Sequence, residues 1–386
     1  MTQMTLTFDA VAEPTPGPKW RARWNRSWPA YEAWFVARGG DQGPSRAQCR
    51  DAMKRYMPEL VATYDRLVAV AGGTDRAARF LSTWCPPTYL GGCSLAAVAT
   101  KKDVRLVRNY DLSPDLNEGL LLRTEWTGRA VMGMVEFLWG LSDGINDAGL
   151  SVALAYGGRS ERGEGFGITT IVRYVLETCD TVDEALSALK RVPSHMAYNI
   201  VLADASGRTS SVELAPGGGM AVMPTAIATN HQSGRTPADR PTFTRTFERR
   251  AHLEQLRIKP RKLNRQFLKA PLLQDRYAQG FGTLFTAEYN PRALTLGLTI
   301  MGKRWNQTLH EFAEGQRIVD YTQGAVSGAT CDEIVCDEIV WGARGVDWSQ
   351  AASVDWNAVG RDYANGKGRE ISTYFSSAAS NAQGAA

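Results

Sequence analysis

Apolar positions in the first part of the chain recur with a helical period. Between 45 and 70 they follow the i, i+3, i+4 rule over several turns, which predicts an amphipathic helix that Pro58 should kink or restart. A further helix is expected over 76–83, after a Gly-Gly pair. Large rings also recur at helical spacing near the start, which predicts one helix face docked on the rest of the protein, at Trp20, Trp24 and Trp28.

After Pro86-Pro87 the pattern changes to short β-prone runs separated by polar or glycine-containing turns. We expect a first group of strands at 93–100, 103–110, 118–125, 129–138 and 149–157. Helices are expected over 167–179 and from 181 onward, where Thr181 and Glu184 form a capping pattern.

The second half repeats this grouping of strands followed by helices. Strands are expected at 199–203, 210–213, 219–222, 226–229, 283–289 and 293–300, and helices at 242–257 and 261–269. Because the strands come in consecutive groups and do not alternate singly with helices, the order argues against βαβ winding. It predicts an α+β fold in which two antiparallel sheets lie between helical layers.

Composition changes this picture little but excludes several function classes. With 386 residues, 44% hydrophobic and 22% charged, the chain has the composition of a globular protein with a large core. The net charge of +4 is small and no basic run with interleaved aromatic residues occurs, so nucleic acid is not an expected partner. The N-terminus lacks a secretory signal and no apolar stretch could span a bilayer, so a cytoplasmic location is expected.

The cysteines and histidines suggest neither a disulfide scaffold nor a metal site. Six cysteines are scattered along the chain, and the four histidines form no HxxxH or HxH pair. We therefore expect reduced thiols, and catalysis without a metal or a cofactor.

Cys93 is the strongest candidate for chemistry. Gly91 and Gly92 precede it, so the backbone there can adopt a strained conformation and the Gly92 carbonyl is unobstructed by side chains. Attack of the thiol on that carbonyl would cut the chain by an N-to-S acyl shift and leave Cys93 with a free α-amino group. That amine titrates at about 7.7 to 8.0 and could serve as the base for its own thiol.

A cation and a carboxylate follow Cys93 at hairpin spacing. Two β-prone runs around a polar turn would bring Arg108 and Asp111 back beside Cys93. A guanidinium favours the thiolate, and a carboxylate could hold the α-ammonium. Strand alternation puts the two side chains on opposite faces, so the strand must bend or end at 109–110 if both are to face the thiol.

Five motifs in order resemble the N-terminal-nucleophile hydrolases: Gly92-Cys93-Ser94, Arg108-Asn109-Tyr110-Asp111, 142–150, 199–207 with Glu213, and Ala228-Thr229-Asn230-His231. The chain is most similar to the isopenicillin-N acyltransferase branch, the acyl-CoA:6-aminopenicillanic acid acyltransferase family. Choloylglycine hydrolase and penicillin V acylase are more distant. The resemblance covers about 93–300 and implies a four-layer αββα sandwich.

The resemblance also implies further site residues. Cys93 would be the nucleophile, supported by Arg108 and Asp111, and Asn230 would be an oxyanion-hole donor. The backbone amide of Tyr156 would be the second donor. A further arginine is expected on the helix after Asn230. The stretch 244–249 offers two candidates, of which we favour Arg249 over Arg245.

The resulting hypothesis is a self-processing cysteine hydrolase of non-peptide or small-peptide amide bonds. An acyltransferase acting to or from an amine or coenzyme A is the first alternative, and a non-catalytic interaction protein on the same scaffold is the second. Cleavage before Cys93 would divide the chain in two: a helical segment, 1–92, that stays associated, and a catalytic chain. The catalytic chain would consist of a catalytic domain, 93–325, and a C-terminal extension with a flexible end, 326–386. The expected partners are a small-molecule amide or acyl substrate and the chain's own N-terminal fragment. A homo-oligomer is left open, and no membrane partner is expected.

Overall fold

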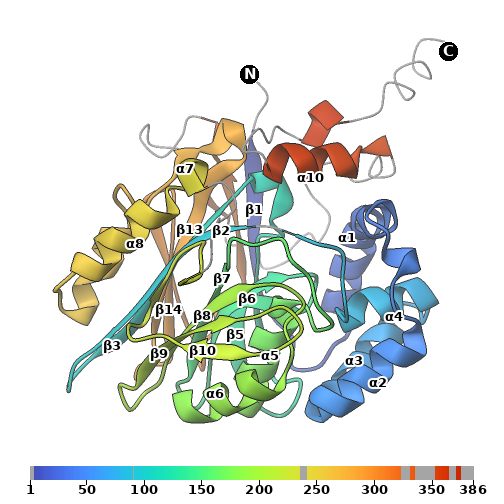
Figure 1. Ribbon diagram of the computed structural model, residues 1–386, viewed down its shortest axis with the longest axis horizontal. Helices are drawn as coiled ribbons and strands as arrows, with labels where there is room; N and C mark the ends of the chain where they lie inside the picture. Colours follow the sequence, from blue (N-terminus) through green and yellow to red (C-terminus); the bar gives the residue numbers. More distant parts are fainter. Residues whose placement is uncertain are drawn as a thin grey trace.

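Two β-sheets stacked face to face form the centre of the molecule, with helices on both outer faces (Figure 1). The computed structural model describes residues 4–89, 91–234, 241–322, 331–334, 353–364 and 371–374. The expected α+β architecture, two sheets between helical layers, is confirmed.

The larger sheet has ten strands among the described residues, in the order β10-β9-β8-β7-β6-β5-β4-β1-β16-β17. Its pairings are antiparallel except for β1 with β4. The strands are β1 (Thr5–Ala12), β4 (Leu120–Thr124), β5 (Val131–Glu136), β6 (Gly140–Asn146), β7 (Ser151–Tyr156), β8 (Tyr198–Ala203), β9 (Thr209–Leu214), β10 (Met220–Val222), β16 (Gly315–Asp320) and β17 (Cys331–Ile334).

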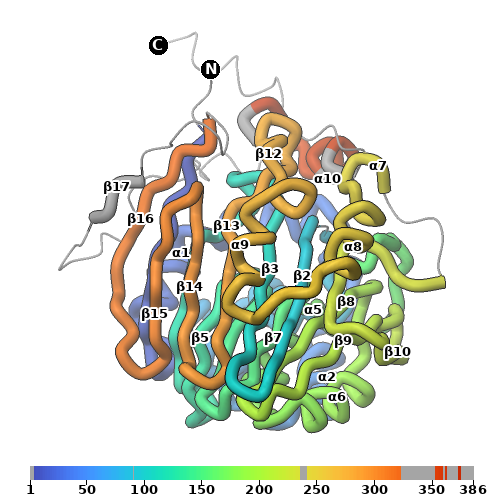
Figure 2. The backbone as a smooth tube through the Cα atoms, turned by 90° about the vertical axis from the view of Figure 1, so that its left-hand side faces the viewer, coloured from blue at the N-terminus to red at the C-terminus, as the bar shows by residue number. Residues whose placement is uncertain are grey.

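The smaller sheet is antiparallel and runs in the order β11-β2-β3-β13-β14-β15, with β12 paired to β13. Figure 2 shows it nearly face on, with β2 and β3 side by side. Its strands are β2 (Gly92–Ala99), β3 (Val104–Leu112), β11 (Ile227–Ala228), β12 (Asp275–Arg276), β13 (Phe281–Asn290), β14 (Thr295–Ile300) and β15 (Lys303–Thr308).

Strand alternation determines which side chains enter the space between the sheets. On β2, Cys93 and Leu95 belong to the core between the sheets, whereas Ala96 belongs to the core under the outer helices. On β3, Leu106 faces inward in the same way, and Val107 faces outward. The two strands form the hairpin that the sequence predicts.

Helices bury the outer face of the larger sheet. Their apolar side chains form one continuous core with that face, and the aromatic residues near the start of the chain are part of it. These helices are α1 (Pro18–Ala37), α2 (Arg46–Tyr56), α3 (Val61–Val70), α4 (Asp75–Ser82), α5 (Ile168–Thr178) and α6 (Val182–Arg191). As expected, the helix predicted over 45–70 is interrupted at Pro58, where a short 3-10 turn separates α2 from α3.

Shorter helices cover the smaller sheet. Apolar residues of α8 and α9 pack on the outward side chains of β2 and β3. The helices of this side are α7 (Pro241–Thr244), α8 (Thr246–Gln255) and α9 (Asn264–Phe267). Near the C-terminus, α10 (Trp356–Ala364) packs against α1. No helix in the described part of the chain is long and apolar enough to cross a membrane.

Several strands were not predicted from the sequence. The segment 1–92 contains β1, which lies between β4 and β16 in the larger sheet. The strand expected over 129–138 ends at Glu136, and β6 follows it as a separate strand. The strands β12, β15, β16 and β17 were also missed.

Candidate active site

The thiol of Cys93 lies between the two sheets, next to a guanidinium. Cys93 is the second residue of β2 and pairs with Tyr110 across the hairpin, so Arg108 lies diagonally opposite on the same face. Arg108 Nη2 is 2.8 Å from Cys93 Sγ, and both residues are buried. The hairpin therefore places a buried cation in direct contact with the sulfur.

Two neighbouring groups, a carboxylate and an aromatic ring, fix the Arg108 guanidinium in position. Its Nη1 donates to Asp143 Oδ2 at 2.7 Å, and neither side chain is exposed to solvent. The ring of Tyr110 lies under it, with 4.4 Å from Cζ to the ring centroid. Asp143 is held in turn by the hydroxyls of Ser142, at 2.9 Å, and Tyr289. A buried ion pair with a hydrogen bond of 2.7 Å thus orients the cation toward the thiol.

The backbone of Cys93 is held from the opposite face of the sheet. Its N–H donates to Asn230 Oδ1 at 2.9 Å. Arg249 Nη1 donates to the Cys93 carbonyl at 2.5 Å and to Ser94 Oγ at 2.8 Å, and its Nη2 donates to Asn230 Oδ1 at 2.7 Å. The start of β2 is therefore fixed on both sides.

Asp111 lies on this second face, opposite Gly92 in the β2–β3 pairing. Its Oδ1 accepts a hydrogen bond from Thr283 Oγ1 at 2.7 Å. Its Oδ2 lies 3.7 Å from Arg249 Nη1 and has no hydrogen-bond partner within the described residues. One carboxylate oxygen beside the Gly92-Cys93 peptide bond is thus able to accept a further donor.

The expected bend of the strand at 109–110 is wrong. The β2–β3 pairing runs without a register shift, and β3 continues to Leu112. Arg108 and Asp111 lie on opposite faces, as regular alternation requires. Both still reach Cys93, because Arg108 contacts the side chain and Asp111 lies beside the backbone.

Tyr156, at the end of β7, joins the site through its backbone. Its carbonyl accepts from Asn230 Nδ2 at 3.2 Å. The loop carrying Asn230 is fixed by Asn199, whose Nδ2 donates to the carbonyls of Thr229 at 2.8 Å and His231 at 2.9 Å. The residues singled out in the sequence therefore converge on one end of β2.

Burial dominates the electrostatics of the site. It raises the pKa of the Cys93 thiol to about 12, although Arg108 acts in the opposite direction and Asp111 adds to the increase. Burial also raises the pKa of Asp111, against the lowering effect of Arg249. The thiol is therefore protonated at neutral pH and needs a base to become a nucleophile.

Two residues of the site had no role in the sequence argument. Asp143 was part of a motif, and Tyr289 was not noticed. The signal for Asp143 was a carboxylate between apolar and small neighbours, Leu141-Ser142 and Gly144-Ile145, because a carboxylate that such a run buries requires a cation as partner. Of the two arginines considered, Arg249 is buried against Cys93, whereas Arg245 pairs with Glu248 at the surface.

The part of the chain that the structure describes holds no cluster of His, Cys, Asp and Glu able to bind a metal ion. The cysteines whose side chains are described are free, namely Cys49, Cys85, Cys93 and Cys179. Two tandem motifs of the same sequence, Cys-Asp-Glu-Ile-Val, occupy 331–340; the backbone of 331–334 forms β17, and 335–340 lie outside the described residues.

Several solved structures resemble this chain at low sequence identity. Penicillin V acylase from Agrobacterium tumefaciens is 15% identical, with a TM-score of 0.37, and the match covers 59% of this chain and 91% of that one. A conjugated bile acid hydrolase variant from Clostridium perfringens is 12% identical, with a TM-score of 0.38 and coverages of 59% and 96%. The Caenorhabditis elegans ortholog of N-acylethanolamine-hydrolyzing acid amidase is 17% identical, with a TM-score of 0.38 and coverages of 52% and 93%.

Comparison at the sequence level identifies the family. No curated protein matches the chain significantly. The model of the family described as acyl-coenzyme A:6-aminopenicillanic acid acyl-transferase matches residues 98–305, more than half of the sequence. This stretch includes most of both sheets and all but the first residues of the site. The chain therefore belongs to the acyl-coenzyme A:6-aminopenicillanic acid acyl-transferase family.

Proposed function

We propose that this chain is a self-processing cysteine hydrolase that cleaves a carbon-nitrogen amide bond through a thioester on Cys93. The observation that carries the proposal is the contact between Cys93 Sγ and Arg108 Nη2, 2.8 Å, at the start of β2, where Gly91-Gly92 directly precedes the cysteine. A buried thiol beside an oriented cation and a glycine carbonyl is suited to nucleophilic attack.

The first reaction is cleavage of the chain itself. Cys93 Sγ attacks the Gly92 carbonyl carbon, the sulfur-carbon bond forms, and the carbon-nitrogen bond breaks. The thiol proton passes to the departing nitrogen, which becomes the α-amino group of Cys93. Water then hydrolyses the thioester, leaving a Gly92 carboxylate and a free thiol.

The groups around the Cys93 nitrogen suit the amine that forms there. Asn230 Oδ1 already accepts from this nitrogen at 2.9 Å. Asp111 Oδ2, which has no hydrogen-bond partner among the described residues, provides a second acceptor on the same face. An α-amine titrates at about 7.7 to 8.0, so it can accept the thiol proton near neutral pH. The role of the base falls to this amine.

Substrate turnover repeats the same chemistry with an external amide. The Cys93 thiolate attacks the substrate carbonyl, and the leaving amine takes the proton. We assign Asn230 Nδ2 and the Tyr156 backbone N–H as the donors to the oxyanion, with Arg249 holding the Asn230 amide in place. Loss of one such donor typically costs about a hundredfold to a thousandfold in rate.

Acyl transfer is the second candidate, and the family match favours it specifically. The family is described by transfer from acyl-coenzyme A to 6-aminopenicillanic acid. The same thioester would be formed, and an amine would replace water as the acceptor.

A cytoplasmic location also belongs to the proposal, and the buried free thiols Cys49 and Cys179 support a reducing compartment.

Mass spectrometry of the expressed protein tests the proposal directly. Under denaturing conditions we expect two chains, divided between Gly92 and Cys93. Under native conditions the two should remain together, because β1 of the first chain is hydrogen-bonded to β4 and β16 of the second.

Incubation with N-acyl amino acids, β-lactams and small peptides, with and without an amine acceptor, should then give an acyl adduct on Cys93. An intact chain that is nevertheless active would overturn the free-amine mechanism.

Replacing Gly92 by alanine is expected to slow self-cleavage at least about tenfold. A Cβ at Gly92 would lie 2.2 Å from Phe281 Cε2 and 3.0 Å from the Asp111 carbonyl oxygen, so the scissile bond must shift. Gly91→Ala is the matched control, because its Cβ would meet only Tyr110 Oη, at 4.0 Å. The measurement is the fraction of cut chain against time after synthesis, and equal rates for the two variants would contradict the proposed cleavage geometry.

A further inference from the structure

Positive charge is concentrated at one edge of the molecule, away from the proposed active site. Between 255 and 274 the chain has six lysines and arginines and no acidic residue. All six are exposed, namely Arg257, Lys259, Arg261, Lys262, Arg265 and Lys269. Two more exposed lysines, Lys101 and Lys102, lie in the connection between β2 and β3. We call these eight residues the basic patch.

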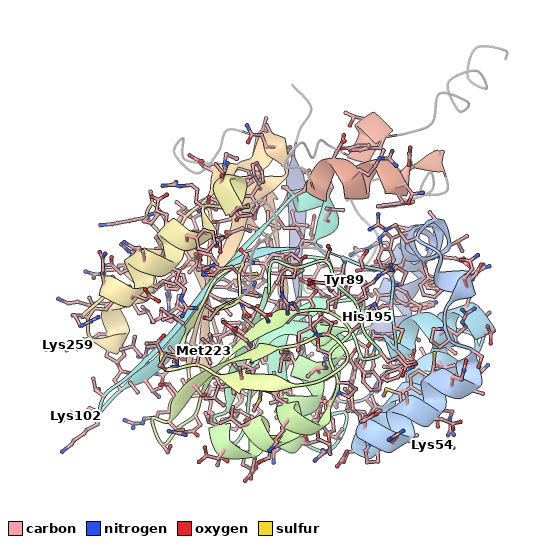
Figure 3. The ribbon with its side chains drawn as sticks, viewed as in Figure 1. Lys54, Tyr89, Lys102, His195, Met223 and Lys259 are labelled. Atoms are coloured by element: carbon pink, nitrogen blue, oxygen red, sulfur yellow. The ribbon has the colours of Figure 1, made fainter. Side chains whose placement is uncertain are left out.

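The packing of the smaller sheet brings the two parts of the basic patch to the same edge. Ile258, after α8, and Val98, near the end of β2, pack on the same small core on the outer face of the sheet. The 3-10 turn Pro260–Lys262 also contacts β2 and β3. Figure 3 shows Lys102 and Lys259 on the same side of the molecule. Cations from two distant segments are thus presented together.

The carboxylates at the margins of the basic patch do not neutralise it. Asp103, next to Lys102, pairs with Arg105 at 2.7 Å, and Glu254 pairs with Arg250 at 2.9 Å. None of the eight cations forms an ion pair within the described residues. The patch carries eight positive charges and the whole chain a net +4, so the other residues are net negative. Net charge alone therefore does not predict this surface.

The composition of the basic patch fits an anionic lipid surface better than a nucleic acid. Five of the eight cations are lysines, whereas bidentate contacts to single phosphates favour arginine. The only aromatic residue between 255 and 274, Phe267, is buried, so no ring is available for a base to stack on. The partly exposed neighbours of the cations are mainly aliphatic, as at Leu256, Ile258, Leu268 and Leu273. Cations beside aliphatic side chains are typical of surfaces that bind a bilayer.

We propose that the basic patch docks this chain on the surface of an anionic membrane. The attraction is electrostatic, because the large apolar residues of this segment, Leu263, Phe267 and Leu272, are buried in the core on the smaller sheet and cannot insert. Each cation held near an anionic bilayer typically raises the affinity about fivefold. The cytoplasmic leaflet of a cell membrane is anionic, which agrees with the proposed location of the chain.

Docking is independent of the proposed catalysis. Ala99, where β2 ends, lies about 20 Å from Cys93 at the usual rise of a strand, and Lys101 lies beyond it. Neither the thiol nor the cleavage of the chain is needed for the attraction. Variants of the basic patch should therefore be cut, and turn over substrate, like the parent chain.

Co-sedimentation of the full-length protein with vesicles tests the basic patch. We expect binding to phosphatidylcholine vesicles that contain about 30% phosphatidylserine, and at least about tenfold weaker binding to phosphatidylcholine alone. Raising the salt from about 0.05 M to about 0.2 M should weaken the binding at least about tenfold. Replacing Lys259 and Lys262 together by glutamine should weaken it at least about tenfold, and so should replacing Lys101 and Lys102.

Two exposed lysines outside the patch provide the matched control. Lys54 lies on α2 and Lys190 on α6, both on the helical face of the larger sheet. Figure 3 shows Lys54 on the opposite side of the molecule from Lys102 and Lys259. Replacing Lys54 and Lys190 together by glutamine removes the same net charge and should change vesicle binding by less than about twofold.

The outcomes separate the basic patch from other surfaces and from the proposed function. Equal binding to neutral and anionic vesicles, or equal losses in the patch and control variants, would overturn the proposal. Tighter binding of a DNA duplex or of polyglutamate than of the anionic vesicles, at the same salt, would also overturn it, because the patch would then suit another class of partner. A chain that cuts itself normally but binds no vesicle would refute the docking surface and leave the proposed function intact.

Discussion

Replacing Cys93 by alanine is expected to leave one uncut chain of 42.3 kDa that turns over no amide. The alanine lacks the sulfur that forms the thioester, and without cleavage the α-amine that serves as base is never made. Removing a nucleophile that acts together with its base typically costs a thousandfold or more in rate. Denaturing mass spectrometry and the rate of amide hydrolysis measure the two effects.

A second buried thiol provides the matched control. Cys179 is also buried and free, but it lies in the core under the helices of the larger sheet. Cys179→Ala should be cut and active like the parent, with a modest loss of stability. Normal cleavage or normal turnover in the Cys93→Ala variant would refute the assignment of the nucleophile.

Replacing Arg108 by leucine is expected to cost about 3–5 kcal/mol in the free energy of unfolding and to abolish turnover. Both members of the pair with Asp143 are fully buried, so removal of the guanidinium leaves a carboxylate without a cation. The thiol also loses the positive charge that favours the thiolate. Denaturant unfolding and the rate of self-cleavage measure these losses.

A neighbouring arginine and a double variant separate the loss of stability from the loss of activity. Arg105, on the same strand, is partly exposed and pairs with Asp103 and Glu288. Because Glu288 keeps Arg304 as a partner, Arg105→Leu should cost at most about 1 kcal/mol. Replacing Arg108 and Asp143 together by leucine should restore much of the stability, because no charge is left unpaired, but should not restore activity. An Arg108→Leu variant no less stable than Arg105→Leu would contradict the buried ion pair.

Local sequence signals were sufficient for the hairpin that carries the site. The two β-prone runs around a polar turn predict β2 and β3, and their antiparallel pairing brings Arg108 to Cys93. The contact between Arg108 and Asp143 was not predictable in this way. It crosses from one sheet to the other, and no local rule specifies which strands of stacked sheets face each other.

The strand β6 was missed because it contains several polar residues although it is buried. Ser142 and Asp143 are polar because they hold Arg108: Ser142 donates a hydrogen bond to Asp143, and Asp143 accepts one from Arg108. Asn146 at its end donates to the carbonyls of Leu176 and Cys179 at the end of α5. A hydrophobicity pattern identifies strands by their apolar faces, and here both faces carry polar side chains: Asp143 bonds to the other sheet and Asn146 to α5.

The strand β1 was missed for a different reason. Its eight residues alternate, but such a short run also occurs in loops, and its partners β4 and β16 are distant in the sequence. Only the assembled sheet shows that these residues pair. The tertiary contact therefore decides the structure of the segment, as is common for strands.

The position of β1 sets an order for synthesis and folding. Thr5 pairs with Asp320, so the gap between β4 and β16 can be closed only after nearly the whole catalytic part has left the ribosome. Pairing over such a separation forms slowly, because a long loop must be closed first. While the peptide bond before Cys93 is intact, β1 stays covalently linked to β4 and β16, the strands with which it pairs. If the chain were cut earlier, β1 would have to find β4 and β16 as a separate molecule at low concentration. We therefore expect cleavage to follow completion of the sheet.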